Sequence, residues 1–167
     1  MKSIILAATL LSLPALAPAA SNAAAVRDVE AVVEAFRTSI IDKDKARFVA
    51  LFLHDRITWQ SVDGDDFVQR RRLKNPKARK VEVEARYNPQ SFIDGIVSDQ
   101  ARTEETFRNV KIETDGDVAS VWFDYAFLQD GRETNRGKEA WQLVNTGEGW
   151  KIVAVVWSMN AGRKTAK

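Results

Sequence analysis

The first clear pattern in the chain is a set of apolar residues that recur at steps of three and four. They extend over residues 26–41, and this spacing is typical of an amphipathic helix with one buried face. Asp42 and Asp44 can cap a second helix, in which the apolar side chains of residues 48–52 share a face. An Asn-Pro pair at 88–89 then opens a third, short helix. The pattern therefore predicts about three helices, all before the main run of strands.

Alternating, β-branched and aromatic residues predict strands in the rest of the chain. Residues 57–62 form one such stretch, and from residue 103 onward the pattern is strand and turn only. Four long strands are expected there, at 107–114, 118–128, 138–145 and 150–159. Asp-Gly pairs follow the first two of these strands, and Asp-Gly between alternating strands is typical of hairpins. We therefore expect an antiparallel meander, whereas the stretch before Tyr87 shows no clear period.

Two of the expected strands are apolar on both faces. In residues 118–128, alternation groups Phe123 with Tyr125 and places Trp122 on the opposite face. In residues 150–159, it places Ile152 opposite Val155. A strand that is apolar on both faces is covered on both sides. We expect helices and a pocket on one side and a second copy of the chain on the other, which predicts a homodimer.

The order of helices and strands, together with several short motifs, resembles a known superfamily. The motifs are Asp130-Gly131-Arg132, Arg136-Gly137-Lys138, Trp141-Gln142-Leu143-Val144, Gly149-Trp150-Lys151-Ile152-Val153 and Trp157-Ser158. The chain resembles the nuclear transport factor 2-like superfamily, whose members include ketosteroid isomerase, scytalone dehydratase and SnoaL-like proteins. The resemblance covers residues 24–160 and implies an α+β fold, in which a curved antiparallel sheet wraps around about three N-terminal helices and forms a cone-shaped apolar pocket. The same fold serves isomerases, dehydratases, cyclases and binding modules, so it does not fix the function.

Composition narrows the chemistry. The 167 residues suit a single domain at 24–167, and the chain has no cysteine and one histidine. Disulfides, Cys-bound metals and a multi-histidine metal site are therefore excluded, and we expect no metal and no cofactor. The 25 basic and 23 acidic residues leave a net charge of +2, which gives no support to nucleic-acid binding.

The N-terminus has the pattern of an export signal at residues 1–23. Lys2 is followed by an apolar stretch at 4–13 that is too short to span a bilayer, and small residues precede Ala24. Cleavage after Ala23 fits best, and cleavage after Ala17 is the alternative. A buried N-terminal helix is disfavoured because Pro14 and Pro18 would break it. We therefore expect a periplasmic or secreted protein.

Two carboxylates are candidate general bases. Asp124 lies between Phe123 and Tyr125 on a strand that is apolar on both faces, and burial would raise its pKa. The alternative is that Asp124 lies at an open rim or pairs with a neighbouring Arg or Lys. Glu139 shares a face with Trp141 and is the second candidate.

The remaining candidates are one histidine and a group of aromatic residues. His54 lies beside Asp55 where the second helix should end, so it can act as an acid or base at the pocket mouth or interact with the negative end of the helix dipole. The candidate ligand-binding residues are Trp59, Trp122, Tyr125, Trp141 and Trp157. Core packing is the alternative for each of them.

Residues 68–90 carry eight basic side chains against two acidic ones. Such a segment can bind an anionic ligand or a membrane surface. The favoured alternative is a solvated loop whose charge is balanced by acidic residues elsewhere. Nucleic acid is disfavoured, because Tyr87 is the only aromatic residue in the segment.

Two hypotheses for the function follow from these observations. The preferred one is an exported protein that binds a small apolar or aromatic ligand in the cone. The alternative is a cofactor-free isomerase, dehydratase or cyclase that uses Asp124 or Glu139 as its base.

Overall fold

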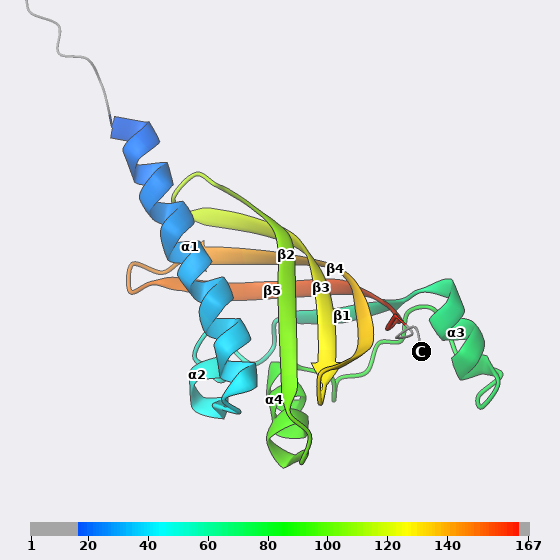
Figure 1. Cartoon of the computed structure of the whole chain (residues 1–167). Helices are drawn as coiled ribbons and strands as arrows, with labels where there is room; N and C mark the ends of the chain where they lie inside the picture. The colour runs from blue at the N-terminus through cyan, green and yellow to red at the C-terminus, as the bar shows by residue number, and fades with distance from the viewer. Residues whose placement is uncertain (1–16, 164–167) are drawn as a thin grey trace, which may run out of the picture.

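The computed structural model describes residues 17–163, so residues 1–16 of the predicted export signal lie outside the described part of the chain. The helices are α1 (Ala17–Ile41), α2 (Lys45–Val49), α3 (Asp65–Arg72) and α4 (Pro89–Ser98). The strands are β1 (Thr58–Asp63), β2 (Thr103–Thr114), β3 (Val118–Gln129), β4 (Arg132–Asn145) and β5 (Trp150–Ala161). Figure 1 shows these elements in chain order.

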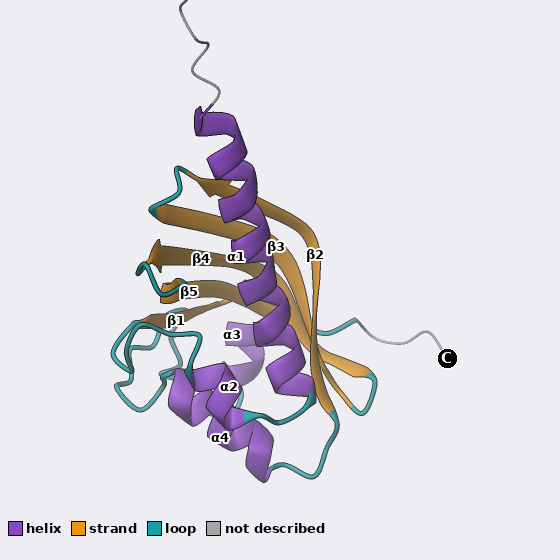
Figure 2. Cartoon of the chain, turned by 90° about the vertical axis from the view of Figure 1, so that its left-hand side faces the viewer, coloured by secondary structure: helices purple, strands orange, loops and turns teal. Residues whose placement is uncertain are grey.

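The five strands form one sheet with the order β1-β5-β4-β3-β2. Strands β2 to β5 are antiparallel neighbours, so the predicted meander is confirmed, and β1 pairs in parallel with β5. The long strands bend, and the concave face of the sheet curves around the helices (Figure 2). The predicted α+β architecture is therefore confirmed.

The core lies between α1 and the concave face. Phe36 of α1 is buried against Trp141 of β4, with 4.7 Å between ring centroids, and against Phe48 of α2 at 4.8 Å. Phe123 of β3 packs edge-on against Trp141 at 5.1 Å. These contacts explain the apolar periodicity of the first helix, because its apolar face packs against the concave face of the sheet.

The second helix is shorter than the sequence pattern predicts. Asp44 caps α2 by accepting a hydrogen bond from the Arg47 backbone amide at 3.0 Å, as expected. The helix ends at Val49, because the chain then turns to pair with β5 through Phe52 and Ile152. Phe48 and Phe52 are both buried even though only Phe48 is helical.

Helix α3 was not predicted. It has a single buried residue, Val68, so an apolar stripe long enough to reveal a helical period is absent from the segment. Its ends nevertheless carry the charges that suit a helix dipole, with Asp65 and Asp66 in the first turn and three arginines in the last.

A bulge in β5 changes the predicted faces of this strand. Ala154 pairs with Gln142 and Ile152 pairs with Leu143, so Val153 is an extra residue. As a result Ile152 and Val155 are both buried on the core face. The prediction that these two residues lie on opposite faces is wrong, because strict alternation does not hold across a bulge.

Candidate functional site

The concave side of the sheet contains a pocket of about 230 Å³, which we call the inner pocket. Its walls come from α1, α4 and all five strands, and most of them are aromatic. The lining residues are Phe36, Trp59, Phe92, Glu105, Tyr125, Phe127, Asn135, Glu139, Trp157 and Met159. Aromatic walls with a few polar groups are typical of small-molecule sites.

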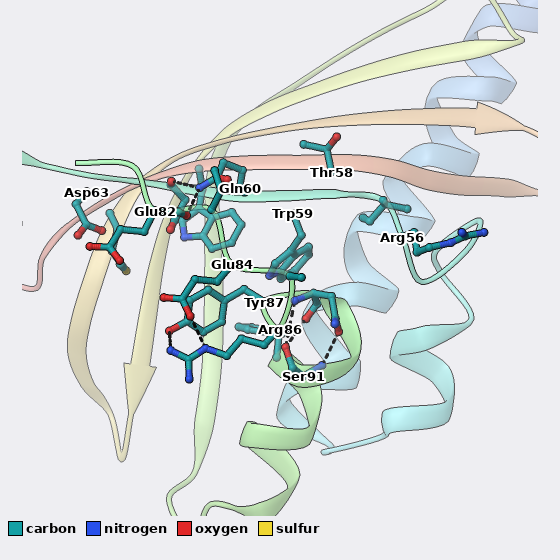
Figure 3. Close-up of a pocket in the computed structure, with 18 of the residues that line it drawn as sticks. Arg56, Thr58, Trp59, Gln60, Asp63, Glu82, Glu84, Arg86, Tyr87 and Ser91 are labelled. Carbon is teal, nitrogen blue, oxygen red and sulfur yellow. Dashed lines mark hydrogen bonds and ion pairs between the residues drawn. The ribbon is translucent and has the colours of Figure 1, made fainter. Parts of the chain in front are cut away.

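A second, larger pocket of about 1140 Å³ lies between β1, the segment that follows α3, and the start of α4. We call it the outer pocket, and Figure 3 shows it with the Trp59 ring directed between β1 and α4. The two pockets share four lining residues, which are Trp59, Phe92, Trp157 and Met159. The outer pocket therefore lies next to the inner one across a largely aromatic wall.

Glu139 of β4 lies in the inner pocket and is only 4% exposed. The indole Nε1 of Trp141, two residues along the same face, donates a hydrogen bond to its Oε1 at 2.8 Å. Burial raises the pKa of Glu139 from its ordinary value of 4.5 to about 7, while the Trp141 hydrogen bond acts in the opposite direction. The structure therefore places this predicted carboxylate on the pocket wall.

Glu105 of β2 is the second carboxylate of the inner pocket, and it was missing from the candidates identified in the sequence. It is 5% exposed, and burial together with the nearby Glu139 holds its pKa well above the ordinary value. The predicted strand began at residue 107, two residues too late to include it. A signal was present, since Glu105 and Phe107 are two residues apart and so share a face of the strand.

Tyr125 and Asn135 complete the polar part of the inner pocket. The Tyr125 hydroxyl lies 3.0 Å from both Asn135 Oδ1 and the backbone oxygen of Ser158. Its single hydrogen is shared between these two hydrogen-bond acceptors. Burial and the nearby Glu105 and Glu139 raise the Tyr125 pKa, so the phenol stays neutral. Tyr125 therefore acts mainly as a fixed donor inside the protein.

Asp124 lies on the other face of β3, outside the inner pocket. Its carboxylate pairs with Lys138 and accepts a hydrogen bond from Asn109 Nδ2 at 2.6 Å. The Lys138 hydrogen bond, followed by that of Asn109, lowers the Asp124 pKa. The prediction that burial raises this pKa is wrong, because alternation turns Asp124 away from the buried Phe123 and Tyr125. The alternative reading, pairing with a neighbouring basic residue, is the one observed.

His54 lies beyond the end of α2 and is exposed. Its Nδ1 accepts a hydrogen bond from the backbone amide of Arg56 at 3.1 Å. Asp55 and Arg56 line the outer pocket, but His54 lines neither the outer nor the inner pocket. The structure thus separates His54 from Glu139. His54 is also not the C-terminal residue of α2.

The aromatic candidates lie in three different parts of the structure. Trp59, Tyr125 and Trp157 line the inner pocket, where the Trp59 and Trp157 rings are 5.2 Å apart. Trp141 is fully buried in the core, where it contacts the lining residues Glu139 and Phe36 but does not line the inner pocket itself. Trp122 is 48% exposed on the outer face of the sheet and lines neither pocket. Alternation separates Trp122 from Phe123 and Tyr125, so it is not placed to contact a ligand in the cone.

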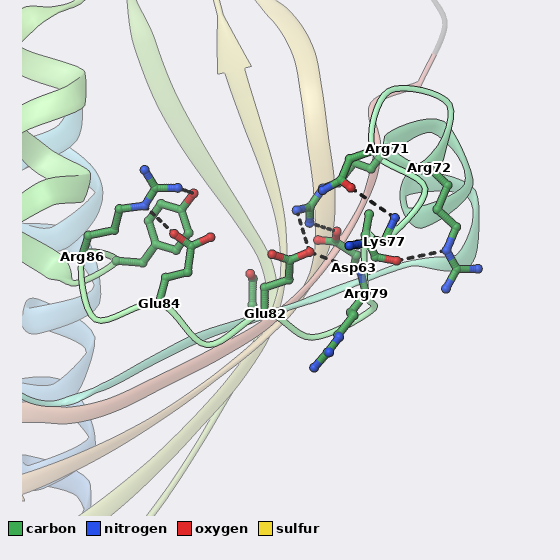
Figure 4. Close-up of polar contacts among 12 residues, drawn as sticks. Asp63, Arg71, Arg72, Lys77, Arg79, Glu82, Glu84 and Arg86 are labelled. Atoms are coloured by element: carbon green, nitrogen blue, oxygen red, sulfur yellow. Dashed lines mark hydrogen bonds and ion pairs between the residues drawn. The ribbon is translucent and has the colours of Figure 1, made fainter.

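Ion pairs reduce the positive charge of residues 68–90. Figure 4 shows Arg71 between Asp63 at 2.5 Å and Glu82 at 3.2 Å. Three further basic residues are paired, in Arg70–Asp66, Lys80–Asp65 and Arg86–Glu84. Because several of these acidic partners lie outside the segment, the local excess of charge is smaller in the fold than along the chain.

Two further properties concern the part of the chain that the structure describes. Within residues 17–163, no group of three or more acidic or histidine side chains is arranged to hold a metal ion. Over the same residues, no helix combines the length and the apolar character needed to cross a membrane.

The curved sheet, the helices on its concave face and the pocket between them define an α+β cone. Models of protein families and curated protein sequences both gave no match to this chain. Solved structures did match, among them a nuclear transport factor 2-like superfamily protein from Salmonella enterica, with a TM-score of 0.56 and 15% identity over 86% of this chain and 95% of that one.

Two Novosphingobium aromaticivorans proteins are also similar in structure. One, provisionally assigned as a scytalone dehydratase, has a TM-score of 0.61 and 14% identity over 89% of this chain and 92% of that one. The other, the β subunit of a provisionally assigned aromatic-ring-hydroxylating dioxygenase, has a TM-score of 0.59 and 16% identity over 86% and 94% of the two chains. The chain therefore has the nuclear transport factor 2-like cone fold, as its sequence pattern predicted.

Proposed function

We propose that this chain binds a small apolar or aromatic molecule in the inner pocket. The observation that carries the proposal is the wall of the pocket, where six aromatic rings surround only three polar side chains other than tyrosine. Burial of apolar ligand surface against such walls is favourable by roughly 25 cal/mol per Å². The volume of about 230 Å³ favours a compact ligand, smaller than those of typical drug-sized sites.

Ligand titration with paired tryptophan variants tests this proposal. A compact aromatic ligand should quench tryptophan fluorescence saturably and raise the melting temperature, because it binds the native state. Trp157→Leu should weaken both effects, since Trp157 lines the inner pocket. The matched control is Trp122→Leu, which removes an indole from the outer face and should leave ligand affinity unchanged. Equal loss of affinity in both variants, or no saturable binding to the wild type, would contradict the proposal.

Proton-transfer catalysis is the second candidate, and the position of Glu139 favours it. A buried carboxyl with a pKa of about 7 is suited to general acid or base catalysis near neutral pH. The hydrogen of Tyr125, however, is directed to Asn135 and Ser158, so it is not free to stabilise an oxyanion that develops on a substrate. Binding is therefore the function that the geometry supports better.

Substrate screening distinguishes the two functions. Enolisable ketones and dehydratable alcohols should give no turnover with the wild type if the chain is a binding protein. Turnover that Glu139→Gln lowers by roughly a hundredfold to ten-thousandfold would instead establish catalysis, since this is the usual contribution of a positioned acid or base. Asp124→Asn is the matched control, because it removes a carboxylate from the outer face of the same sheet.

A further inference from the structure

The charged groups of the inner pocket are all of one sign. Its lining includes two carboxyl groups, Glu105 and Glu139, and no Lys, Arg or His. The lining residues from α1, α4, β1 and β5 carry no titratable side chain, so Tyr125 is the only other titratable group on the wall. A ligand in this pocket therefore meets negative or neutral carboxyl groups and no positive charge.

The two carboxyl groups have few partners within the protein. Among the residues that the structure describes, Glu139 takes part in one side-chain hydrogen bond, from Trp141, and in no ion pair. The Glu105 side chain, also buried, forms neither a hydrogen bond nor an ion pair with any described residue, and it lines the pocket. A buried carboxylate normally has a hydrogen-bonding or charged partner, because removing it from water without one is costly. Glu105 thus presents an unpartnered acceptor to whatever occupies the pocket.

The aromatic walls favour the same kind of ligand. Trp59 lies 5.4 Å from Phe92 and 5.2 Å from Trp157, measured between ring centroids, and all three rings line the pocket. The faces of aromatic rings attract cations, most strongly for Trp and where water is excluded. Trp157 is the cross-strand neighbour of Glu139 in the β4–β5 register, so the aromatic rings and the carboxyl groups adjoin in one pocket. Together they are complementary to an organic cation.

We propose that the ligand of the inner pocket is a small aromatic or apolar amine, bound in its protonated form. Its ammonium group would donate hydrogen bonds to Glu105 and Glu139, while its apolar part would pack against Trp59, Phe92 and Trp157. This inference rests on the proposed binding function and specifies the chemical class of the ligand. It differs from the catalytic alternative, which requires a neutral substrate that gives up a proton to Glu139.

Three probes of nearly equal size test the charge of the ligand. Phenethylamine carries the ammonium group, phenethyl alcohol replaces it with a hydroxyl, and acetophenone offers only an acceptor. Calorimetric titration at about pH 8 should show phenethylamine binding at least tenfold more tightly than either neutral probe, since charge-assisted hydrogen bonds are about twice as strong as neutral ones. Tighter binding of the alcohol or the ketone would overturn the inference while leaving the proposed binding function in place. Failure of all three probes to bind at millimolar concentration would count against both the amine inference and the proposed binding function.

The pH dependence gives an independent readout. An alkylamine stays protonated between about pH 5.5 and pH 8, so any change in its affinity comes from the protein. The carboxyl that pairs with it must lose its proton, so the affinity for phenethylamine should rise with pH, by up to about tenfold per unit, and level off above the pKa. Proton release should accompany binding below that point and appear as a dependence of the heat on the buffer. Affinity that is independent of pH would contradict pairing with these carboxyl groups.

Amide variants identify the groups responsible. Glu105→Gln and Glu139→Gln keep the shape of each side chain. Each variant should lower the affinity for phenethylamine at least tenfold at about pH 8, while its affinity for phenethyl alcohol should stay within about threefold of the wild-type value. Asp124→Asn, on the outer face, is the matched control and should change neither affinity. Unfolding curves of each variant establish that it folds before affinities are compared. Unchanged amine affinity in both folded Gln variants would overturn the proposal.

Discussion

At the scale of single residues, the pair Glu139 and Trp141 links the core to the pocket. Trp141 is fully buried among Phe36, Phe123 and other core rings, yet its indole N–H is directed to the Glu139 carboxyl. A buried indole N–H usually has such a partner. The core thereby fixes the position of the carboxyl that the pocket presents.

The raised pKa of Glu139 predicts how protein stability depends on pH. The folded state holds this proton more tightly than the unfolded chain, so the contribution to stability is complete below about pH 4.5 and is lost as the pH rises to about 7. Glu139→Gln removes this loss. Its melting temperature should therefore exceed that of the wild type by several degrees at about pH 8, since each 1 kcal/mol shifts it by roughly 2–4 °C. The difference should become small at about pH 4.5.

Thermal unfolding across this pH range checks the prediction. The control is Asp124→Asn, for which the sign is opposite: the pKa of Asp124 is lowered, so its contribution is present at neutral pH and lost in acid. A wild type that is more stable than Glu139→Gln at about pH 8 would show that the hydrogen bond from Trp141 outweighs the cost of the buried charge.

At the scale of elements, the close approach of β4 and β5 at Gly137 holds Tyr125 in place. Gly137 pairs with Tyr125 across the β3–β4 register, and a Cβ at this position would lie 1.8 Å from the backbone oxygen of Ser158. The same Ser158 oxygen accepts a hydrogen bond from the Tyr125 hydroxyl. Position 137 therefore requires glycine, because the backbone of β5 lies too close to leave room for a Cβ.

Gly137→Ala should force β4 and β5 apart and lower the free energy of unfolding by about 1–3 kcal/mol. The matched control is Gly95→Ala, because a Cβ at Gly95 in α4 meets no atom within 4 Å. This control should leave stability unchanged or raise it by up to about 1 kcal/mol, as Ala favours a helix more than Gly does. Chemical denaturation measures both. Equal stability of the two variants would contradict the proposed role of Gly137.

The elements also show how far the sequence could be interpreted. The meander and the helix periodicity were predictable, because a long amphipathic helix and Asp-Gly hairpins leave strong local signals. Helix α3 and the bulge at Val153 were not, since a helix with one buried residue has little period and a bulge depends on the partner strand. In the site, the sequence candidates Glu139 and Trp59 line the inner pocket, whereas Glu105 was missed because strand boundaries are uncertain by a few residues.

At the scale of the whole molecule, the outer face of the sheet carries an apolar row. Trp122, Ala140 and Val156 are neighbours across β3, β4 and β5, and Trp122 and Val156 are 48% and 39% exposed. We propose that a second copy of the chain covers this face. Light scattering at micromolar concentration should give about twice the mass of one chain. Trp122→Glu would bury a charge in the interface, so it should lower the measured mass to that of the monomer. A monomeric wild type throughout this range would refute the proposal.

Export is a second prediction at the scale of the whole molecule. The charged Lys2, the apolar stretch and the small residues before Ala24 favour cleavage after Ala23. Intact mass of protein recovered from a secreting host should correspond to a chain that begins at Ala24 or within a few residues of it. Recovery of a chain that retains Met1 would show that the segment is not removed.

The inner pocket of the cone is proposed to hold a small apolar or aromatic ligand. The most direct measurement is a crystal structure of the protein with the probe that gives the largest thermal shift. Ligand density between Trp59, Tyr125 and Trp157, with a polar group of the ligand near Glu105 and Glu139, is the predicted result. An empty inner pocket with ligand bound beside Trp122 on the outer face would contradict the account.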